Sequence, residues 1–347
     1  MAEDTDGTDV GQDEFTQDNI GDLGDGGDVR TGYIRLTTGE LKALQFSVVG
    51  NRALFEGDIV LGTVDELERD TALISGDADG VTHGVGITGQ QYRWPNALLP
   101  YEIDAGVTNG EARVAAAIAH LEQMTKMRFV RRTAANASTY PNYVHVIRSD
   151  GCWSRVGMRG GRQELSLADG CGFGAVVHEF LHALGLWHEQ SREDRDSFVT
   201  VHWANIEAGK EHNFNQHISD GDDIGPYDYG SIMHYGTHGF SKNGQPTLTP
   251  KQAGASIGQR SGLSTGDIAA VHSMYRLTYT VTVSQVFATA QSRNGWAHLA
   301  GLGWRQVERL TDDGVTNTFA QLVFARAFDR SVTVVADGST IYQVYLR

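Results

Sequence analysis

The segment His178–Glu189, which reads H-E-F-L-H-A-L-G-L-W-H-E, constrains this chain most strongly. In a helix, residues 178 and 182 are one turn apart, so the imidazoles of His178 and His182 lie on the same face. Two imidazole nitrogens at this spacing suit a zinc ion. Gly185 lets the chain leave the helix with a positive φ, and His188 can then swing back as a third ligand.

The first acidic residue of this segment, Glu179, indicates a catalytic site. Three protein ligands leave one position of a tetrahedral zinc ion open for water, which is typical of catalytic sites. Glu179 projects beside the histidine pair, where its carboxylate can take a proton from that water. The alternative is a helix with solvated histidines, but the rest of this helix is apolar: Phe180, Leu181, Ala183, Leu184 and Leu186. We therefore predict one catalytic Zn²⁺. Four other histidines lack ligand spacing and are expected to be structural: His202, His212, His217 and His234.

The negative charge of the chain is concentrated at its N-terminus. The 347 residues carry 28 Lys and Arg against 43 Asp and Glu, a net charge of −15. The first 30 residues contain one basic residue, Arg30, and the acidic residues Glu3, Asp4, Asp6, Asp9, Asp13, Glu14, Asp18, Asp22, Asp25 and Asp28. Residues 1–32 are therefore predicted to be disordered. Nucleic acid is excluded as a partner, because its binding needs clustered Lys and Arg.

The state of the two cysteines indicates whether the protein belongs to a reducing or an oxidising cellular compartment. Cys152 and Cys171 are either free thiols of a cytosolic protein or a disulfide. Their closeness, around a Gly-rich segment just before the zinc motif, favours a disulfide, which would contribute about 3 kcal/mol in the loop-entropy model. A disulfide predicts an oxidising, extracellular compartment. No run approaches the roughly 18 apolar residues of a membrane span, and we expect the secretory signal that export needs to have been removed before this numbering begins.

The middle of the chain mixes helical and strand patterns, which predicts an α+β domain. Apolar periodicity predicts helices over Asn109–Met127, Gly172–Leu184 and Ser264–Tyr275. Ser264 followed by Asp267 is an acidic variant of a capping box. The alternation in Asn142–Arg148 predicts a strand.

The C-terminal part, from Thr278 to Arg347, has a different residue pattern. It contains four β-prone runs between Gly, Asn and Asp: Thr280–Val286, Thr318–Phe324, Ser331–Val335 and Thr340–Leu346. These runs predict a small all-β domain. Trp296 and Trp304 are either core residues or a binding platform, and we expect core residues.

The zinc segment fits the pattern H-E-x-x-H-x-x-G-x-x-H of the metzincin clan, and Glu189 directly after the third histidine makes it resemble the astacin family. Residues 231–236, S-I-M-H-Y-G, resemble the Met-turn of that family. Further similar segments are 92–103, 152–157 and 192–201, so the resemblance covers residues 91–277. The chain departs from many astacins in having one cysteine pair instead of two.

The resemblance implies a fold and further site residues. The implied fold is metzincin-like, with a mixed β-sheet, long helices and zinc in a cleft between two subdomains. Met233 would lie beneath the metal. Tyr235 would be an additional zinc ligand that can leave the metal and donate a hydrogen bond to the developing oxyanion. The substrate would be a polypeptide lying extended in the cleft.

A segment far upstream resembles the inhibitory motif of astacin precursors. Residues 55–59 read F-E-G-D-I, and in the similar F-x-G-D motif of astacin propeptides the aspartate replaces the catalytic water on zinc. Here that residue is Asp58, and the alternative is an ordinary turn at Gly57. The chain's own propeptide would then be its inhibitor. The resemblance also implies that cleavage near Val85 creates an N-terminus that connects through water to Glu189.

The surrounding region, from Gly32 to Gly89, has short apolar runs at Leu41–Val49 and Ala53–Leu61 and reads as an accessory piece or an ordinary subdomain. We therefore predict a propeptide over 1–84, an astacin-like zinc protease domain over 85–278 and an all-β domain over 279–347. The predicted protein is a secreted endopeptidase, latent while Asp58 binds the zinc. The rival hypotheses are a zinc-binding pseudoenzyme, against which Glu179 argues, and an adhesion protein that acts through its β domain.

Overall fold

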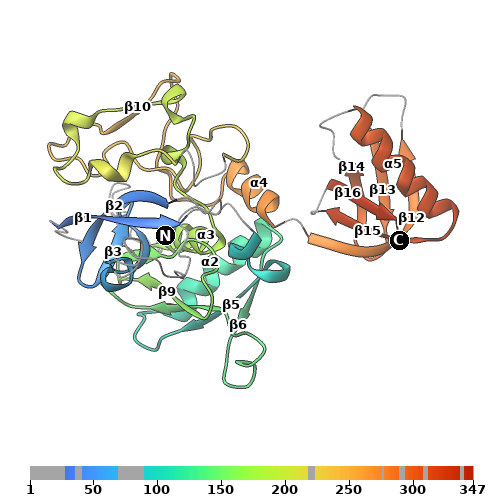
Figure 1. Ribbon diagram of the computed structural model, residues 1–347, viewed down its shortest axis with the longest axis horizontal. Helices are drawn as coiled ribbons and strands as arrows, with labels where there is room; N and C mark the ends of the chain where they lie inside the picture. Colours follow the sequence, from blue (N-terminus) through green and yellow to red (C-terminus); the bar gives the residue numbers. More distant parts are fainter. Residues whose placement is uncertain are drawn as a thin grey trace, which may run out of the picture.

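The computed structural model describes residues 28–35, 41–68, 90–217, 223–275, 277–288, 294–307, 312–336 and 340–346 (Figure 1). Nine strands form one sheet in the order β1-β2-β3-β4-β8-β9-β7-β5-β6. They are β1 (Val29–Arg35), β2 (Leu41–Val49), β3 (Arg52–Phe55), β4 (Ile59–Thr63), β5 (Leu98–Ile103), β6 (Arg128–Arg131), β7 (Tyr143–Ile147), β8 (Cys152–Ser154) and β9 (Arg162–Leu167). Because β5 runs parallel to β6 and β7 while β8 runs antiparallel to β9, the sheet is mixed, as predicted.

The four N-terminal strands extend this sheet from its β8 side. Strands β1 to β4 pair antiparallel with one another, and Ile59 of β4 pairs parallel with Ser154 of β8. The predicted apolar run Ala53–Leu61 is divided between β3 and β4, with a turn at residues 56–58. This turn contains Asp58, the residue predicted to bind the zinc ion in the latent form.

The prediction of disorder over residues 1–32 is wrong for Val29–Gly32. These residues belong to β1 and pair with Leu44–Ser47 of β2, so a partner distant in the sequence orders a segment whose composition is polar. The first 27 residues lie outside the described part of the chain.

Three helices lie within the predicted limits: α2 (Gly110–Met124), α3 (Phe173–Leu184) and α4 (Thr265–Met274). The capping box of α4 is present, since the Ser264 hydroxyl accepts from the amide of Asp267 and the Asp267 carboxylate accepts from the amide of Ser264. Helices α2 and α3 share a buried apolar core with the sheet, which includes Leu99, Leu121, Val144, Leu165 and Phe180. Burying each such side chain contributes about 1.5–3 kcal/mol, and the core thereby holds α3 in place.

The C-terminal end of α3 is closed by side chains from outside the helix. The indole Nε1 of Trp94 donates to the carbonyl of Ala183 at 2.7 Å, and the hydroxyl of Tyr275 donates to the carbonyl of Leu184 at 2.7 Å. The last carbonyls of a helix have no partner within it. These two bonds therefore stabilise the end of α3 from which the zinc motif continues.

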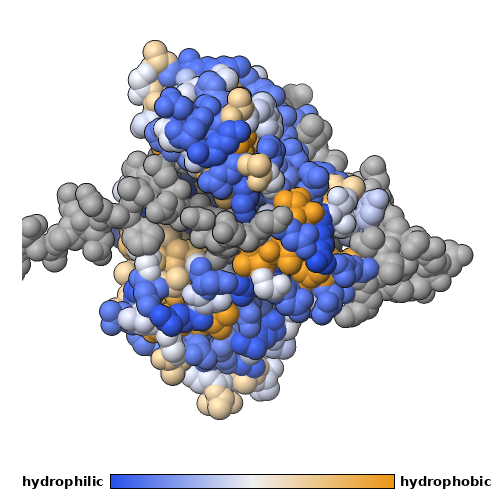
Figure 2. Space-filling model, turned by 90° about the vertical axis from the view of Figure 1, so that its left-hand side faces the viewer, coloured by the Kyte–Doolittle hydropathy of each residue, from blue (hydrophilic) through white to orange (hydrophobic). Residues whose placement is uncertain are grey.

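A second region, over residues 198–257, has little regular structure. Its two strands, β10 (Val199–Val201) and β11 (Leu248–Pro250), form a small sheet. Short 3-10 helices here and elsewhere are η1 (Gln90–Tyr92), η2 (Pro95–Ala97), η3 (Glu189–Ser191), η4 (Arg195–Ser197), η5 (Trp203–Asn205) and η6 (Glu211–Phe214). Tyr235 belongs to the core of this region, whereas Met233 belongs to the core around α3. The predicted Met-turn therefore connects the two regions. Figure 2 shows hydrophobic residues gathered across the middle of one face, between two mainly hydrophilic parts.

The C-terminal part is a closed barrel with a helix, which Figure 1 shows to one side of the rest of the molecule. The strand order is β12-β13-β14-β16-β15. The elements are β12 (Leu277–Ala288), β13 (Gly295–Leu299), β14 (Gly303–Val307), α5 (Asp312–Ala327), β15 (Ser331–Ala336) and β16 (Thr340–Leu346). Three of the four predicted β-prone runs lie in β12, β15 and β16.

The prediction that this part is all-β is wrong, because the fourth run, Thr318–Phe324, lies in α5. Leu322 and Ala325 are buried in the barrel core, with Phe319 packed against it. Apolar residues three apart suit a helix face, and this spacing outweighs the β-prone composition. The expectation that Trp304 is a core residue is also wrong, because 42% of its surface is exposed.

Candidate metal centre

The structure brings the three predicted histidines together. His178 and His182 lie on successive turns of α3, with ring centroids 4.7 Å apart. Gly185, directly after the helix, has φ 113, a left-handed conformation that favours glycine. The chain turns back there, and the ring of His188 lies 5.2 Å from that of His178 and 4.7 Å from that of His182.

The orientation of each imidazole is set through its Nδ1 atom. Nδ1 of His178 donates to the carbonyl of Ile232 at 2.9 Å, and Nδ1 of His182 donates to the carbonyl of Leu186 at 2.8 Å. Nδ1 of His188 donates to a carboxylate oxygen of Glu56 at 2.9 Å. Because these oxygens accept, the ring protons are on Nδ1, and the three Nε2 lone pairs face one another. Metal-binding histidines in proteins are held in this way.

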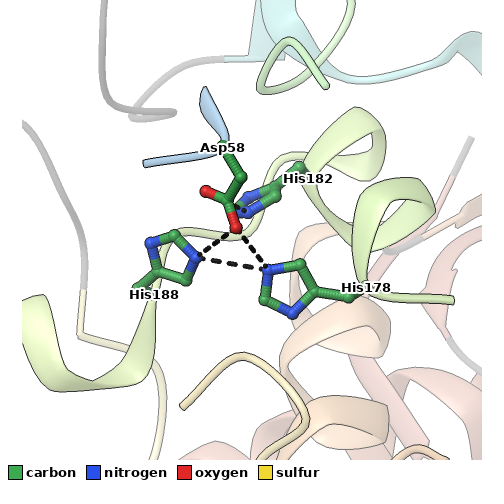
Figure 3. Close-up of side chains that lie close together, drawn as sticks. All are labelled: Asp58, His178, His182 and His188. Carbon is green, nitrogen blue, oxygen red and sulfur yellow. Dashed lines mark hydrogen bonds and ion pairs between the residues drawn. The ribbon is translucent and has the colours of Figure 1, made fainter. Parts of the chain in front are cut away.

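Asp58 completes the group, which we call the four-residue cluster: Asp58, His178, His182 and His188 (Figure 3). One carboxylate oxygen, Oδ2, lies 3.2 Å from Nε2 of His178 and 3.2 Å from Nε2 of His188. The other, Oδ1, lies 3.6 Å from Nε2 of His182. All four side chains are buried, and their ligand atoms lie within 4.8 Å of one another.

These residues fit a zinc ion. Oδ1 of Asp58 and Nε2 of His182 are buried without a hydrogen-bond partner among the described residues, and buried polar atoms left unpaired in a native protein call for an explanation such as an ion. Three imidazole nitrogens and one carboxylate oxygen form a donor set that zinc prefers. The cluster therefore has the residues and the closeness of ligand atoms that a zinc site needs.

The turn between β3 and β4 places Asp58 in the cluster. Glu56 and Gly57 have φ values of 47 and 79, both in the left-handed region. The carbonyl of Asp58 accepts a hydrogen bond from the amide of Ser154 in β8 at 2.9 Å. The carbonyl of Glu56 accepts one from the Tyr235 hydroxyl at 2.5 Å. The main chain on both sides of Gly57 is thus bonded to the middle region of the chain.

The side chain of Glu56 is fully buried beside the cluster. One of its carboxylate oxygens accepts from Nδ1 of His188, and the other accepts from Nε2 of His217 at 2.8 Å and from the Ser191 hydroxyl at 2.5 Å. Burial raises the pKa of this carboxyl, but the charge of His217 and the hydrogen bonds from His188 and His217 outweigh burial and lower the pKa to about 2. Glu56 is therefore an ionised partner of the third histidine.

Glu179, which is buried, and Arg260, which is partly buried, are ionisable groups close to the cluster. Neither carboxylate oxygen of Glu179 has a hydrogen-bond partner among the described residues. Burial, and then the charge of Asp58, raise the pKa of Glu179 well above its usual value. Burial lowers the pKa of Arg260 to about 10, against the opposing influence of Asp58 and Glu179. Arg260 donates to the carbonyl of His234 at 3.0 Å, which holds its positive charge near these two carboxylates.

The Met-turn residues lie near the third histidine. The rings of Tyr235 and His188 have centroids 4.7 Å apart, while the Tyr235 hydroxyl is bonded to Glu56. Met233 is buried, and its carbonyl accepts from the amide of Glu189 at 3.1 Å. The segment therefore fixes the chain directly after His188.

Glu189 is bonded to residues outside the cluster. Its carboxylate accepts from the amide of Asp228 at 2.8 Å and lies 3.6 Å from the guanidinium of Arg192. Burial raises its pKa to about 8. A cavity of about 80 Å³ lies beside it, lined by residues that include Arg93, Leu186, His188, Glu189, Arg192 and Asp223.

Cys152 and Cys171 form a disulfide, so the alternative of two free thiols is excluded. The bond connects β8 to the residue before the N-cap of α3. Since β8 also bonds the main chain of Asp58, the disulfide connects two of the elements that build the site.

Sequence reasoning missed Glu56, which orients His188, and two residues near the cluster, Ser191 and Arg260. His217 was expected to be structural, and it lies outside the four-residue cluster but contacts Glu56. Glu56 is the variable position of the motif F-x-G-D, and 161 residues separate it from His217. A pattern of local spacing cannot show such a contact.

Comparisons with known proteins point to one protein family. Residues 86–276 match the model of the Astacin peptidase family. The chain is 40% identical to zinc metalloproteinase nas-15 of Caenorhabditis elegans over 235 residues, which is 64% of this chain and 39% of that protein. It is 34% identical to zinc metalloproteinase nas-4 of the same organism over 267 residues, which is 75% of this chain and 80% of that protein.

A solved structure is also similar. High choriolytic enzyme 1, a hatching enzyme zinc-protease from Oryzias latipes, has 38% sequence identity and a TM-score of 0.50, and the match covers 55% of this chain and 98% of that one. The chain spans 39% of nas-15 and 53% of zinc metalloproteinase nas-13 of C. elegans, less than two thirds of these relatives.

Proposed function

Because this chain belongs to the astacin family of zinc metalloendopeptidases, we propose that it hydrolyses peptide bonds in polypeptides and that its own N-terminal segment holds it latent. The observation that carries this proposal is the carboxylate of Asp58 among the Nε2 atoms of His178, His182 and His188. We assign the propeptide to residues 1–84, the protease domain to 85–278 and a separate C-terminal domain to 279–347. The C-terminal domain has a core of its own.

His178, His182 and His188 hold the zinc ion in this proposal. When bound, the ion supplies Lewis acidity, which lowers the pKa of water toward 7 and polarises a peptide carbonyl. Glu179 takes the proton of the attacking water and delivers it to the leaving amine. Its two buried oxygens have no hydrogen-bond partner among the described residues, which leaves them available for this transfer.

Tyr235 stabilises the oxyanion that develops on the substrate carbonyl. Its hydroxyl is a suitable donor for that charge. In the latent form the same hydroxyl donates to the main-chain carbonyl of Glu56, so it already binds a peptide carbonyl beside the cluster. The propeptide therefore occupies the place of a substrate at this point.

Latency rests on two carboxylates of the propeptide. Asp58 would occupy the ligand position that water needs on a zinc ion held by the three histidines, and Glu56 accepts from the outer nitrogen of His188. Pairing of β4 with β8 holds the turn that carries both. Removal of the segment up to about Val85 exposes the zinc and lets the new N-terminus approach Glu189. The partly buried carboxyl of Glu189 and the adjacent cavity support this destination.

We place the protein outside the cell. The disulfide between Cys152 and Cys171 favours an oxidising compartment. No helix in the described part of the chain is long and apolar enough to cross a membrane.

Digestion of gelatin by the processed protein tests the proposal. The wild type and a Glu179→Gln variant are cut near Val85 by limited proteolysis, and the zinc content of each is measured. We expect both to hold one zinc ion, and the variant to lose activity by at least about 100-fold, because general acid–base catalysis contributes 10²–10⁴-fold. Glu111→Gln, at an exposed position of α2, is the control and should digest gelatin like the wild type. A processed wild type that holds zinc but digests no protein would support a pseudoenzyme instead.

A further inference from the structure

Trp296 and Trp304, for which the sequence left a core or a binding role open, share one face of the C-terminal barrel. We propose that this face binds a neutral carbohydrate chain. The barrel stands to one side of the rest of the molecule (Figure 1), and the family match over residues 86–276 ends before the barrel begins at Leu277. The proposal therefore concerns a part of the chain that the peptidase function does not explain.

The pairing of β12, β13 and β14 gathers four ring side chains. Phe287 is directly opposite Trp296, and His298 is directly opposite Trp304. Directly opposite residues of an antiparallel pair lie on the same side of a sheet, and so do residues two apart in one strand, such as Trp296 and His298. The four rings therefore form one continuous patch, which we call the aromatic face: Phe287, Trp296, His298 and Trp304.

The aromatic face is turned toward solvent. Phe287 is 51% exposed and Trp304 is 42% exposed, and the other two rings are partly buried. The alternate residues of the same strands, such as Ala297 and Val307, fill the barrel core instead. Single exposed apolar residues are common on proteins, whereas contiguous ones mark surfaces that bind something. The position of these four rings therefore indicates a binding role.

Hydrogen bonds hold the rings of this face in place. The indole Nε1 of Trp296 donates to Oδ1 of Asn294 at 2.7 Å. The Ser284 hydroxyl and Nδ1 of His298 form a hydrogen bond at 2.6 Å. The rings of His298 and Trp304 meet edge to face, with centroids 5.5 Å apart. Because side chains that are already ordered lose less entropy on binding, the aromatic face is prepared for a ligand.

The residue types of this surface indicate the chemistry of the ligand. A sugar ring presents C–H groups on its faces and hydroxyls around its rim. Aromatic rings, whose faces carry partial negative charge, attract the C–H groups, and side chains such as Ser284 and Gln306, which is opposite Trp296, can bond the hydroxyls. The one residue among Asp, Glu, Lys and Arg in β12, β13 and β14 is Arg305, which is opposite Ala297 on the other side of these strands. The surface therefore suits a neutral carbohydrate better than a charged ligand.

A polypeptide suits this surface less well. Extended peptides that bind to sheets pair with a free edge strand, and the strands of the closed barrel, β12-β13-β14-β16-β15, have no free edge. Proline-rich peptides bind aromatic grooves without such pairing. Binding of a proline-rich chain is therefore the competing outcome of the test.

Binding to insoluble polysaccharides tests the proposal. The full-length chain is mixed with cellulose, chitin or curdlan, which are all neutral, and with immobilised gelatin as the proline-rich chain, and the bound fraction is measured against protein concentration. We expect saturable binding to at least one polysaccharide, and about 1 M salt should not weaken it, because no charge pair is there to be screened. Binding to none of the three polysaccharides, binding that salt abolishes, or binding to gelatin alone would overturn the proposal.

Variants assign the binding to the aromatic face. Trp304→Ala and Phe287→Ala each remove one exposed ring, and we expect each to raise the Kd about 10-fold or more, since burying an aromatic side chain is worth at least that factor. Trp304→Phe keeps a ring and should retain most of the affinity. Trp203→Ala is the matched control, because Trp203 is 47% exposed but lies outside the barrel, and it should bind like the wild type.

A urea midpoint for each variant separates lost binding from lost folding. Phe328→Ala, at a 64% exposed position directly after α5, is a second control within the same domain and should change neither Kd nor midpoint. If Trp304→Ala unfolds the barrel, Phe287→Ala decides in its place. A Kd equal to that of the wild type in both variants would contradict the proposal. The latent chain serves in every measurement, so the outcome does not depend on whether the protein cleaves peptides.

Discussion

Oδ2 of Asp58 lies 3.2 Å from Nε2 of His188, although 130 residues separate them in the sequence. Both side chains are fully buried. A carboxylate here occupies the position that a catalytic water requires, and the same turn sends Glu56 to the other nitrogen of the same imidazole. The segment that we propose as the propeptide thus contacts both sides of one predicted zinc ligand.

Replacing Asp58 should weaken latency. We expect the uncut Asp58→Ala precursor to cleave a fluorogenic peptide at least about 10-fold faster than the uncut wild type, because the fourth zinc position opens to water. Asp65→Ala, at an exposed position of the same segment, is the control. An Asp58→Ala precursor as inactive as the wild type would show that Asp58 is not the latch.

Replacing Glu56 should loosen the propeptide while leaving the carboxylate of Asp58 in the chain. Glu56→Gln leaves buried donors facing an amide, and such a loss costs about 1–3 kcal/mol of folding free energy. We expect a lower urea midpoint and faster cleavage of peptide by the uncut precursor. Glu68→Gln, whose carboxylate is exposed, should change neither. Unchanged latency and stability in Glu56→Gln would contradict a role for this carboxylate.

Removing the metal should destabilise the precursor. The four ligands of the cluster come together only in the folded chain, so zinc at about 1,000 times its dissociation constant stabilises it by about 4 kcal/mol. We expect EDTA to lower the urea midpoint and zinc to restore it. Magnesium should not restore it, because it prefers oxygen ligands in octahedral geometry. A midpoint insensitive to EDTA in a sample shown to be zinc-free would contradict the site.

Asp267 should act on zinc affinity through the Met-turn. Its carboxylate accepts from the amide of Ile232 at 3.0 Å, and the carbonyl of Ile232 accepts from Nδ1 of His178 at 2.9 Å. Loss of such an outer partner typically costs 10–100-fold in metal affinity, and we expect about this loss in Asp267→Ala. Ser264→Ala removes the helix cap, which costs about 1 kcal/mol, together with a hydrogen bond from the Ser264 hydroxyl to Asp228, and should leave zinc affinity unchanged. Equal zinc affinities in the two variants would assign Asp267 to capping only.

Deleting the C-terminal domain should spare catalysis. The barrel core and the core around α3 share no residues. We expect the chain truncated after Thr278 to fold, bind zinc and, once processed, cleave peptides like the full chain. Loss of activity in a truncated protein that still folds and binds zinc would show that the barrel contributes to the active site.

The local spacing of residues in the sequence determined the zinc-binding histidines and one helix cap. Residues four apart in a helix share a face, so His178 and His182 converge wherever α3 forms, and Gly185 allows the turn that returns His188. The capping box at Ser264 is equally local. These features depend on backbone geometry over a few residues, which a sequence displays directly.

Only the tertiary structure decided what surrounds those histidines. The closeness of Asp58 to the cluster depends on the pairing of β4 with β8, and the contact between Glu56 and His217 depends on a turn and a loop far apart in the chain. In the C-terminal domain, packing of Leu322 against the barrel made a helix of a β-prone run. Such outcomes arise from burial and hydrogen bonding between distant segments, and these energies exist only once the chain has folded.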